Sequence, residues 1–172
     1  MADTLIVTGP EDLSSALRAA GRTGSRVLLT GGAAGALPPA QGGVRLYVPP
    51  ELAAQFPEAH VAVLCPLTGQ PVFSLLRRHR LRFGARAAAV FRPGALLAEL
   101  RPGQPAQLRA ARPDAIDGDV RCSPACLCAY TLTRREGGIT AVLFDTEKTL
   151  ARRCALARRL GVECIVLPDE PA

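Results

Sequence analysis

Short apolar runs alternate with segments of helical periodicity along the first half of the chain. The apolar runs occupy Leu5–Val7, Val27–Leu29, Val44–Val48, Val61–Cys65 and Ala87–Phe91. Between them, the spacing of apolar residues predicts a helix from Pro10 to Gly21, a short helix over Pro50–Phe56 and a longer one over Gln70–Leu81. Strands that are apolar throughout and separated by helices are typical of a parallel sheet covered on both faces.

The second half of the chain has a different pattern. Two antiparallel hairpins are predicted, one pairing Leu96–Leu100 with Gln107–Ala110 across "RPGQ", the other pairing Leu127–Thr133 with Thr140–Phe144 across "RREGG". Asp145 or Thr146 can then cap a helix that leads to a last strand. The buried stripe of this helix is Leu150, Cys154, Ala157 and Leu160, and the strand is Cys164–Leu167. We therefore expect one α/β domain over residues 1–172, built of parallel strand-helix units and two hairpins.

Composition narrows the classes of function. Hydrophobic residues make up 48% of the chain, yet no apolar run reaches the roughly 18 residues of a membrane span. The first residues lack the pattern of a secretory signal, so we expect a cytoplasmic protein without membrane contact. The net charge of +6 is carried almost wholly by arginine, and the chain has two tyrosines and no tryptophan on which bases could stack. We therefore do not expect nucleic acid to be the partner. Nucleic-acid binding remains the alternative because four arginines are close together in the sequence, at Arg77, Arg78, Arg80 and Arg82.

A glycine-rich segment, "TGGAAGAL" from Thr30, is similar to the phosphate-binding loop of short-chain dehydrogenases. Leu37 stands where the last glycine is needed, and Pro38 and Pro39 prevent a helix from continuing through that point. Neither tyrosine is followed three residues later by the lysine of that family. We interpret Gly31–Gly43 as a loop and expect no nucleotide cofactor.

The segment "CSPACLC" contains the candidate metal ligands Cys122, Cys126 and Cys128. Three cysteines this close can share a soft metal such as zinc, but the second pair of a structural zinc site is missing nearby. We interpret them as small apolar residues of a strand and expect no cofactor. A zinc site or a redox-active thiol on these three residues is the alternative. In a cytoplasmic chain all six cysteines are expected to be reduced.

A third candidate is "DAIDGDVR". Asp114, Asp117 and Asp119 have the spacing of the acidic signature of family 18 glycoside hydrolases, in which a glutamate two residues further on protonates the leaving oxygen. Arg121 occupies that position, and arginine does not donate a proton at neutral pH. We therefore interpret this segment as an acidic surface loop.

The C-terminal segment "ITAVLFDTEKTLARRCALARRLGVECIVLP" resembles the closing strand, helix and strand of barrels related to family 18 glycoside hydrolases, including spore-germination types. The resemblance implies a (β/α) barrel of the TIM type. Because a full barrel takes about 200–250 residues, this one would be reduced. Since the catalytic glutamate is not found, the resemblance implies ancestry more than activity.

Together these features favour a bacterial binding or scaffold protein without catalysis of its own. Its strand ends are expected to gather at one rim, where such folds bind ligands. The rim residues are Thr8, Thr30, Pro49, Cys65 and Asp145. Missing outer helices would expose apolar sheet, so self-association into a homo-oligomer is expected.

Overall fold

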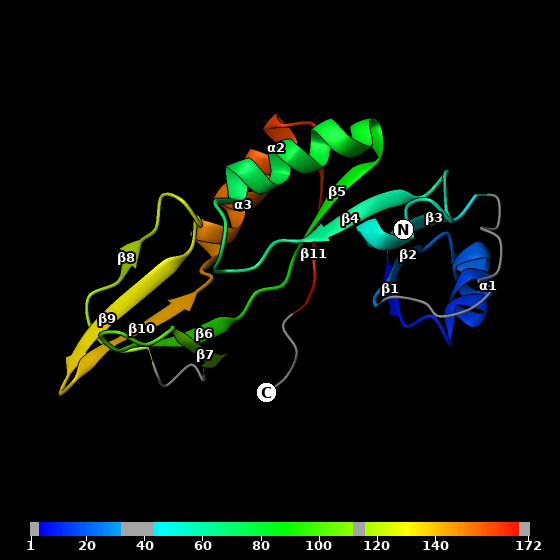
Figure 1. Ribbon diagram of the computed structural model, residues 1–172. Coiled ribbons are helices and arrows are strands. Elements are labelled where there is room, and N and C mark those ends of the chain that lie inside the picture. The colour runs from blue at the N-terminus through cyan, green and yellow to red at the C-terminus, as the bar shows by residue number, and fades with distance from the viewer. Residues whose placement is uncertain (1–3, 32–42, 112–115, 169–172) are drawn as a thin grey trace. The chain divides into compact units, whose positions relative to one another are not determined.

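The computed structural model describes residues 4–31, 43–111 and 116–168 of the chain (Figure 1). These residues form two compact units. The first contains the described residues up to Val63 together with His79–Ala88, and the second contains Leu64–Arg78 and the described residues from Ala89 onward.

The elements follow one another in a mixed α/β order (Figure 1). The helices are α1 (Leu13–Thr23), α2 (Val72–Phe83) and α3 (Glu147–Arg159), with the 3-10 turns η1 (Pro50–Leu52) and η2 (Gly84–Arg86). The parallel sheet has the order β1 (Leu5–Thr8), β2 (Arg26–Leu29), β3 (Arg45–Val48), β4 (His60–Leu64), β5 (Ala87–Phe91), β11 (Glu163–Val166). The antiparallel sheet has the order β7 (Gln107–Ala110), β6 (Ala95–Leu100), β10 (Gly138–Phe144), β9 (Ala129–Arg135), β8 (Arg121–Cys122). The α/β prediction, with parallel strands and two hairpins, is confirmed.

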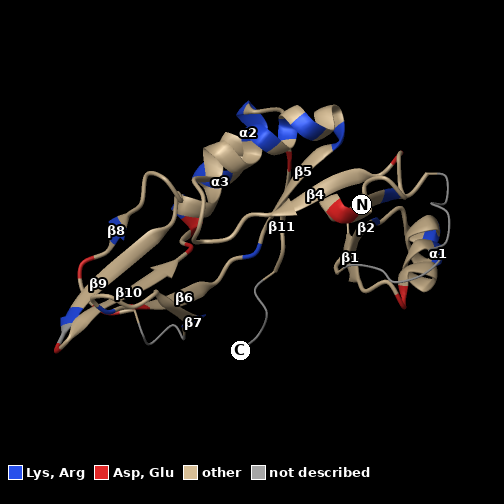
Figure 2. Ribbon diagram, viewed as in Figure 1, with Lys and Arg blue, Asp and Glu red and all other residues tan. Residues whose placement is uncertain are grey.

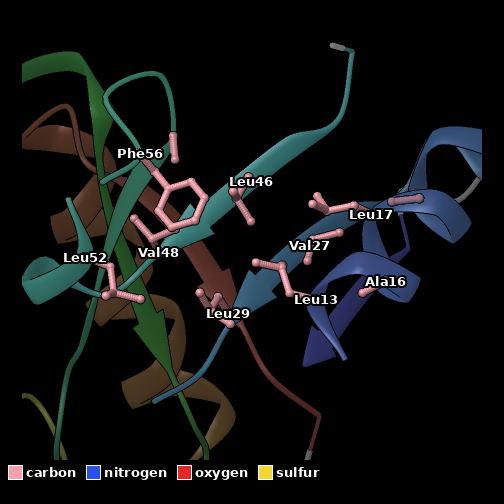
Figure 3. Close-up of a cluster of buried hydrophobic side chains, with 11 residues drawn as sticks. Leu13, Ala16, Leu17, Val27, Leu29, Leu46, Val48, Leu52 and Phe56 are labelled. Carbon is pink, nitrogen blue, oxygen red and sulfur yellow. The ribbon is translucent and has the colours of Figure 1, made fainter. Parts of the chain in front are cut away.

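The core of the first unit lies between α1 and the parallel strands (Figure 3). Leu13 and Leu17 lie one turn apart on α1, so both point at the strands, where they pack with Val27 and Leu29. All four side chains are almost fully buried, and each such burial stabilises the fold by roughly 1.5–3 kcal/mol. This packing explains why α1 forms although its first turn carries no acidic residue and its N-cap makes no side-chain hydrogen bond.

The observed ends of α1 differ from the predicted ones. The helix begins at Leu13 rather than Pro10 and continues past Gly21 to Thr23. Gly24 ends it with a left-handed backbone, φ 69°, and donates its N–H to the carbonyl of Ala20 at 2.8 Å. Glycine adopts this conformation without steric cost, so Gly24 ends the helix in place of the predicted Gly21. The short helix predicted over Pro50–Phe56 is reduced to η1.

One buried cluster of the second unit lies on one face of the antiparallel sheet. Strand β10 is central, because Phe144 pairs with Ala95 on β6 and with Ala129 on β9. Ala129, Val142 and Phe144 are buried and make up a cluster on this face. The second hairpin begins later than predicted, since Leu127 has φ 52° and therefore cannot belong to a strand. The predicted strand over the cysteine segment is wrong there, because Cys126 lies in a turn before β9.

Candidate functional site

A buried ion pair lies where β10 ends in the second unit. Asp145 directly follows β10, and Arg153 is two turns further on in α3. One guanidinium nitrogen of Arg153, Nη1, donates to both carboxylate oxygens of Asp145 at 3.1 Å. The side chains are 0% and 2% exposed, respectively, so water does not screen the pair.

The sequence between the two residues determines this geometry. Thr146 accepts the N–H of Thr149 at 3.2 Å, and Thr149 Oγ1 accepts the N–H of Thr146 at 2.7 Å, which is a reciprocal cap at the helix start. The cap fixes the direction in which α3 leaves β10. Thr149, Arg153 and Ala157 recur at intervals of four residues, so they share the buried face of the helix.

The other guanidinium nitrogen of Arg153 binds the end of β4. Nη2 donates to the carbonyl of Cys65 at 2.6 Å and to that of Pro66 at 3.0 Å. The guanidinium carbon also lies 4.8 Å from the ring centre of Phe91, the last residue of β5, in cation–π geometry. The Nε atom is buried without a hydrogen-bond partner among the described residues. Arg153 therefore joins the ends of β4, β5 and β10 within the second unit.

Two thiols in this region are held in the neutral form. Burial raises the pKa of Cys65 to about 12, although the positive charge of Arg153 opposes part of the rise. Burial likewise raises the pKa of Cys128 to about 11, with further contributions from Cys126 and Asp145, and its Sγ donates to the carbonyl of Leu67 at 3.7 Å. Because nucleophiles and metal ligands are thiolates, these residues are poor candidates for either role at neutral pH.

The three candidate metal ligands differ in their exposure to solvent. Cys122 is exposed in β8, Cys126 is half-buried in the following turn, and Cys128 is buried. Within the described parts of the chain, no group of three or more histidine, cysteine, aspartate or glutamate residues could hold a metal ion. The interpretation of these cysteines as buried apolar residues is wrong for Cys122 and applies best to Cys128.

The predicted rim residues divide between the two units. In the first unit, Thr30 Oγ1 donates to the carbonyl of Thr8 at 3.2 Å, so the ends of β1 and β2 are joined there, and Pro49 follows β3. In the second unit, Cys65 and Asp145 both bind Arg153. Sequence reasoning missed Arg153 itself. The only available signal was an arginine next to Cys154 in the expected buried stripe.

A groove lies beside α3 in the second unit. It has two adjoining hollows of about 340 and 350 Å³ that share Pro124, Leu127 and Arg152. The further lining residues are Phe73, Ala125, Ala155, Leu156 and Arg159 for the first hollow, and Cys122, Ser123 and Thr149 for the second. The floor is therefore largely apolar, the two charged groups are both arginines, and no acidic residue is among the lining residues.

Two further sequence predictions concern loops. Most of the glycine-rich segment, including Gly35, lies outside the described residues, and so does Asp114. Asp117 and Asp119 are exposed and precede β8 without belonging to a strand. For these two residues, the prediction of an acidic surface loop is confirmed.

Arginines are concentrated on α2, as Figure 2 shows. Arg77, Arg78 and Arg82 are exposed, and Arg80 is half-buried. None of the helices among the described residues is long and apolar enough to cross a lipid bilayer.

The fold is similar to that of solved glycoside-hydrolase-like proteins. The spore cortex-lytic enzyme SleL of Bacillus cereus matches with a TM-score of 0.58 at 12% identity, over 91% of this chain and 48% of its own. SleL of Bacillus megaterium QM B1551 matches with a TM-score of 0.48 at 9% identity, over 96% of this chain and 45% of its own. The Bacillus subtilis protein ydhD, described as a sporulation-specific glycosylase, matches with a TM-score of 0.45 at 14% identity. The match covers 94% of this chain and 63% of ydhD.

The match to the Bacillus cereus enzyme places the chain in a class of folds: it is α/β and resembles part of a glycoside-hydrolase-like barrel. The chain spans about half the length of that structure. No protein-family model matches the sequence, and no curated protein matches it. The predicted resemblance is thus confirmed for the fold.

Proposed function

We propose that the chain is a non-catalytic binding protein of the bacterial cytoplasm, built on a reduced barrel of the family 18 glycoside-hydrolase type. The likeness of its fold to a cortex-lytic enzyme supports the ancestry. Arg121, in place of a catalytic glutamate, supports the loss of catalysis.

The buried ion pair carries the proposal. Barrel glycosidases place their carboxyl groups at the carboxyl ends of strands, where one of them must reach the sugar to donate a proton. Asp145 follows a strand end, but its side chain is 2% exposed and both of its oxygens accept hydrogen bonds from Arg153. A carboxyl group held in this way cannot reach a sugar, so it serves structure rather than catalysis.

The groove beside α3 supplies the binding surface. Its apolar floor, with Phe73 and Leu156, and its two arginines match a ligand that has both apolar groups and carboxylates. Fragments of peptidoglycan have this chemistry, because they join N-acetylated sugars to a peptide that ends in carboxylate. We therefore propose a ligand of the muropeptide class, either released from cortex or present in the cytoplasm as a nucleotide-linked precursor.

The absence of catalysis is tested with purified spore cortex and an active cortex hydrolase as positive control. We expect no release of reducing ends above buffer, and no difference between the wild type and Asp145→Asn. Cortex hydrolysis by the wild type that Asp145→Asn abolishes, with folding verified by circular dichroism, would overturn the proposal.

Binding is tested by calorimetry with soluble muropeptides and, separately, with the nucleotide-linked precursor. Arg159→Glu should weaken binding about tenfold, as expected for the loss of a charged hydrogen bond. Arg158→Glu is the matched control, since Arg158 is the exposed neighbour on the same helix and is not among the residues that line the groove. Equal effects of the two substitutions, or no binding of either ligand, would reject the site. Salt-dependent retention on DNA instead would favour the arginines of α2.

A further inference from the structure

Two sulfur atoms approach each other closely between α3 and β11. Cys154 lies on α3 and Cys164 on β11, and their Sγ atoms are 2.8 Å apart. Non-bonded heavy atoms ordinarily rest about 3.5–4.0 Å apart, whereas a disulfide bond measures about 2.0 Å. Both residues are free thiols in the structure, as are the other cysteines. The Cys164 thiol thus donates a hydrogen bond to the sulfur of Cys154, and the two sulfurs are nearer than ordinary contact without a covalent bond between them.

The two thiols differ in their access to solvent. Cys154 is 8% exposed, whereas Cys164 is half-buried, so a small reagent can reach the second more easily. Burial, together with the hydrogen bond and the charge of Cys154, raises the pKa of Cys164 to about 12, and the positive charge of Arg158 opposes part of the rise. Cys65 also contributes to the rise, but less than Cys154 does. The partner that dominates the surroundings of Cys164 is thus Cys154.

We propose that Cys154 and Cys164 are the two halves of an intramolecular disulfide that forms when the chain meets a peroxide. In the first step Cys164 reacts as its thiolate, a fraction that burial keeps small at neutral pH and that grows as the pH rises, so the reaction is slow at pH 7 and faster in alkaline solution. The thiolate attacks hydrogen peroxide, the O–O bond breaks to give a sulfenic acid and hydroxide, and the hydroxide takes up the proton lost by Cys164 to form one water. In the second step the sulfur of Cys154 attacks the sulfenic sulfur, the S–O bond breaks, and a second water leaves with the proton of Cys154. Two thiols are oxidised by two electrons, and one peroxide is reduced to two waters.

The local sequence makes the bond directly measurable. Trypsin cuts after Arg153, Arg158 and Arg159, so Cys154 falls in peptide 154–158 and Cys164 in peptide 160–172. The wild-type protein is treated with hydrogen peroxide, denatured, alkylated and digested. Mass spectrometry should then find the two peptides joined and 2 Da lighter than their sum, with neither cysteine alkylated. Dithiothreitol before alkylation should separate them.

Variants and controls define the pair. Cys154→Ser and Cys164→Ser should each eliminate the joined peptides, whereas Cys122→Ser, which removes an exposed thiol, should leave them unchanged.

Thermal unfolding of the wild-type protein is a second measurement and requires no variant. Because the bond closes only the loop of residues 154–164, oxidation should raise the thermal midpoint of the wild type by roughly 5–10 °C, reversibly with dithiothreitol.

Two outcomes would overturn the proposal. In the first, both cysteines remain alkylatable after peroxide treatment that oxidises Cys122. In the second, Cys164 is joined to Cys65 instead of Cys154. Neither outcome depends on whether the groove binds a ligand, so this inference and the proposed function can fail separately.

Discussion

Arg153 shows how a charged side chain can be accommodated with no exposed surface. Removing an ion from water costs several kcal/mol, and that cost is offset only when nearly every polar atom finds a partner. Here four hydrogen bonds and the ring of Phe91 supply the partners, and Nε alone has none. Loss of the Asp145 side chain would therefore leave the charge of Arg153 buried without the carboxylate that it binds.

We expect Arg153→Met to lower the free energy of unfolding by about 3–5 kcal/mol, since it removes one partner of a buried ion pair. The double variant Asp145→Asn with Arg153→Met should lose less than the sum of the single variants. Urea unfolding followed by circular dichroism measures both. Arg109→Met is the control, because Arg109 pairs with Glu99 at 2.9 Å but its side chain is 67% exposed, and its loss should cost less than about 1 kcal/mol. If Arg153→Met and Arg109→Met lowered the free energy of unfolding equally, the role given to Arg153 would be contradicted.

His79 is a buried residue in the first unit whose ionisation affects stability. Its Nε2 atom lies 2.7 Å from the carbonyl of Val61, and its ring contacts Phe83. Burial lowers the pKa of His79 below 6.5; the backbone hydrogen bonds with Val61 and Ala88 oppose the shift, and Arg82 adds to it. The native state therefore binds this proton more weakly than the unfolded chain does.

The expected consequence is a loss of stability as the pH falls below about 6.5, because the unfolded chain then takes up a proton that the native state resists. Above that pH both states are neutral at this residue, and the effect is absent. Urea unfolding between pH 5 and pH 8 measures the slope. His79→Gln, which keeps a polar group that can reach Val61, should flatten it. If the free energy of unfolding of this variant depended on pH as steeply as that of the wild type, the pH dependence would come from other groups.

Among the elements, those with a strong apolar pattern could be predicted from the sequence. The parallel strands and the helix α2 lie within two residues of their predicted bounds, because each buries a continuous run or a periodic face. The start of α1 could not be predicted in the same way. Pro10, Glu11 and Asp12 suit a first turn, yet the packing of Leu13 places the first helical residue three positions later.

Elements that depend on distant partners left no local signal. Strand β8 consists of two residues, and it exists because Arg121 and Cys122 pair with Tyr130 and Ala129 on β9. Leu127 is in the left-handed region without being a glycine, so the residue type gives no sign of this conformation before β9. The candidate site also could not be predicted from local sequence, since Arg153 binds carbonyls that lie 87 and 88 residues earlier in the chain.

At the scale of the whole molecule, the fold likeness extends much further than the sequence resemblance. The sequence resembled a barrel only in its C-terminal segment, whereas the structural match to the cortex-lytic enzyme covers 91% of the chain at 12% identity. Apolar patterning can keep a fold while most residues change, because packing needs size and polarity rather than identity.

We predict that residues 1–172 unfold as one domain, although they form two compact units. The division between the units falls within β4, α2 and β5, so neither unit contains all of its helices and strands intact. Two tyrosines report on the units separately, since Tyr47 lies in the first and Tyr130 in the second, and the chain has no tryptophan.

In Tyr47→Phe only Tyr130 fluoresces, and in Tyr130→Phe only Tyr47 does. Within each variant, under reducing conditions, the urea midpoint from fluorescence should coincide with the midpoint from circular dichroism. Midpoints that differ within either variant would show that the units unfold independently and that the chain comprises two domains.

The mutual dependence of Asp145 and Arg153 also constrains how such a chain can change over generations. A lineage that loses one of the two residues first passes through an intermediate in which this buried ion pair is broken, and that intermediate loses a large part of the roughly 5–15 kcal/mol that stabilises a typical domain. Descendants should therefore retain the two residues together or replace them together, with an apolar pair filling the same space.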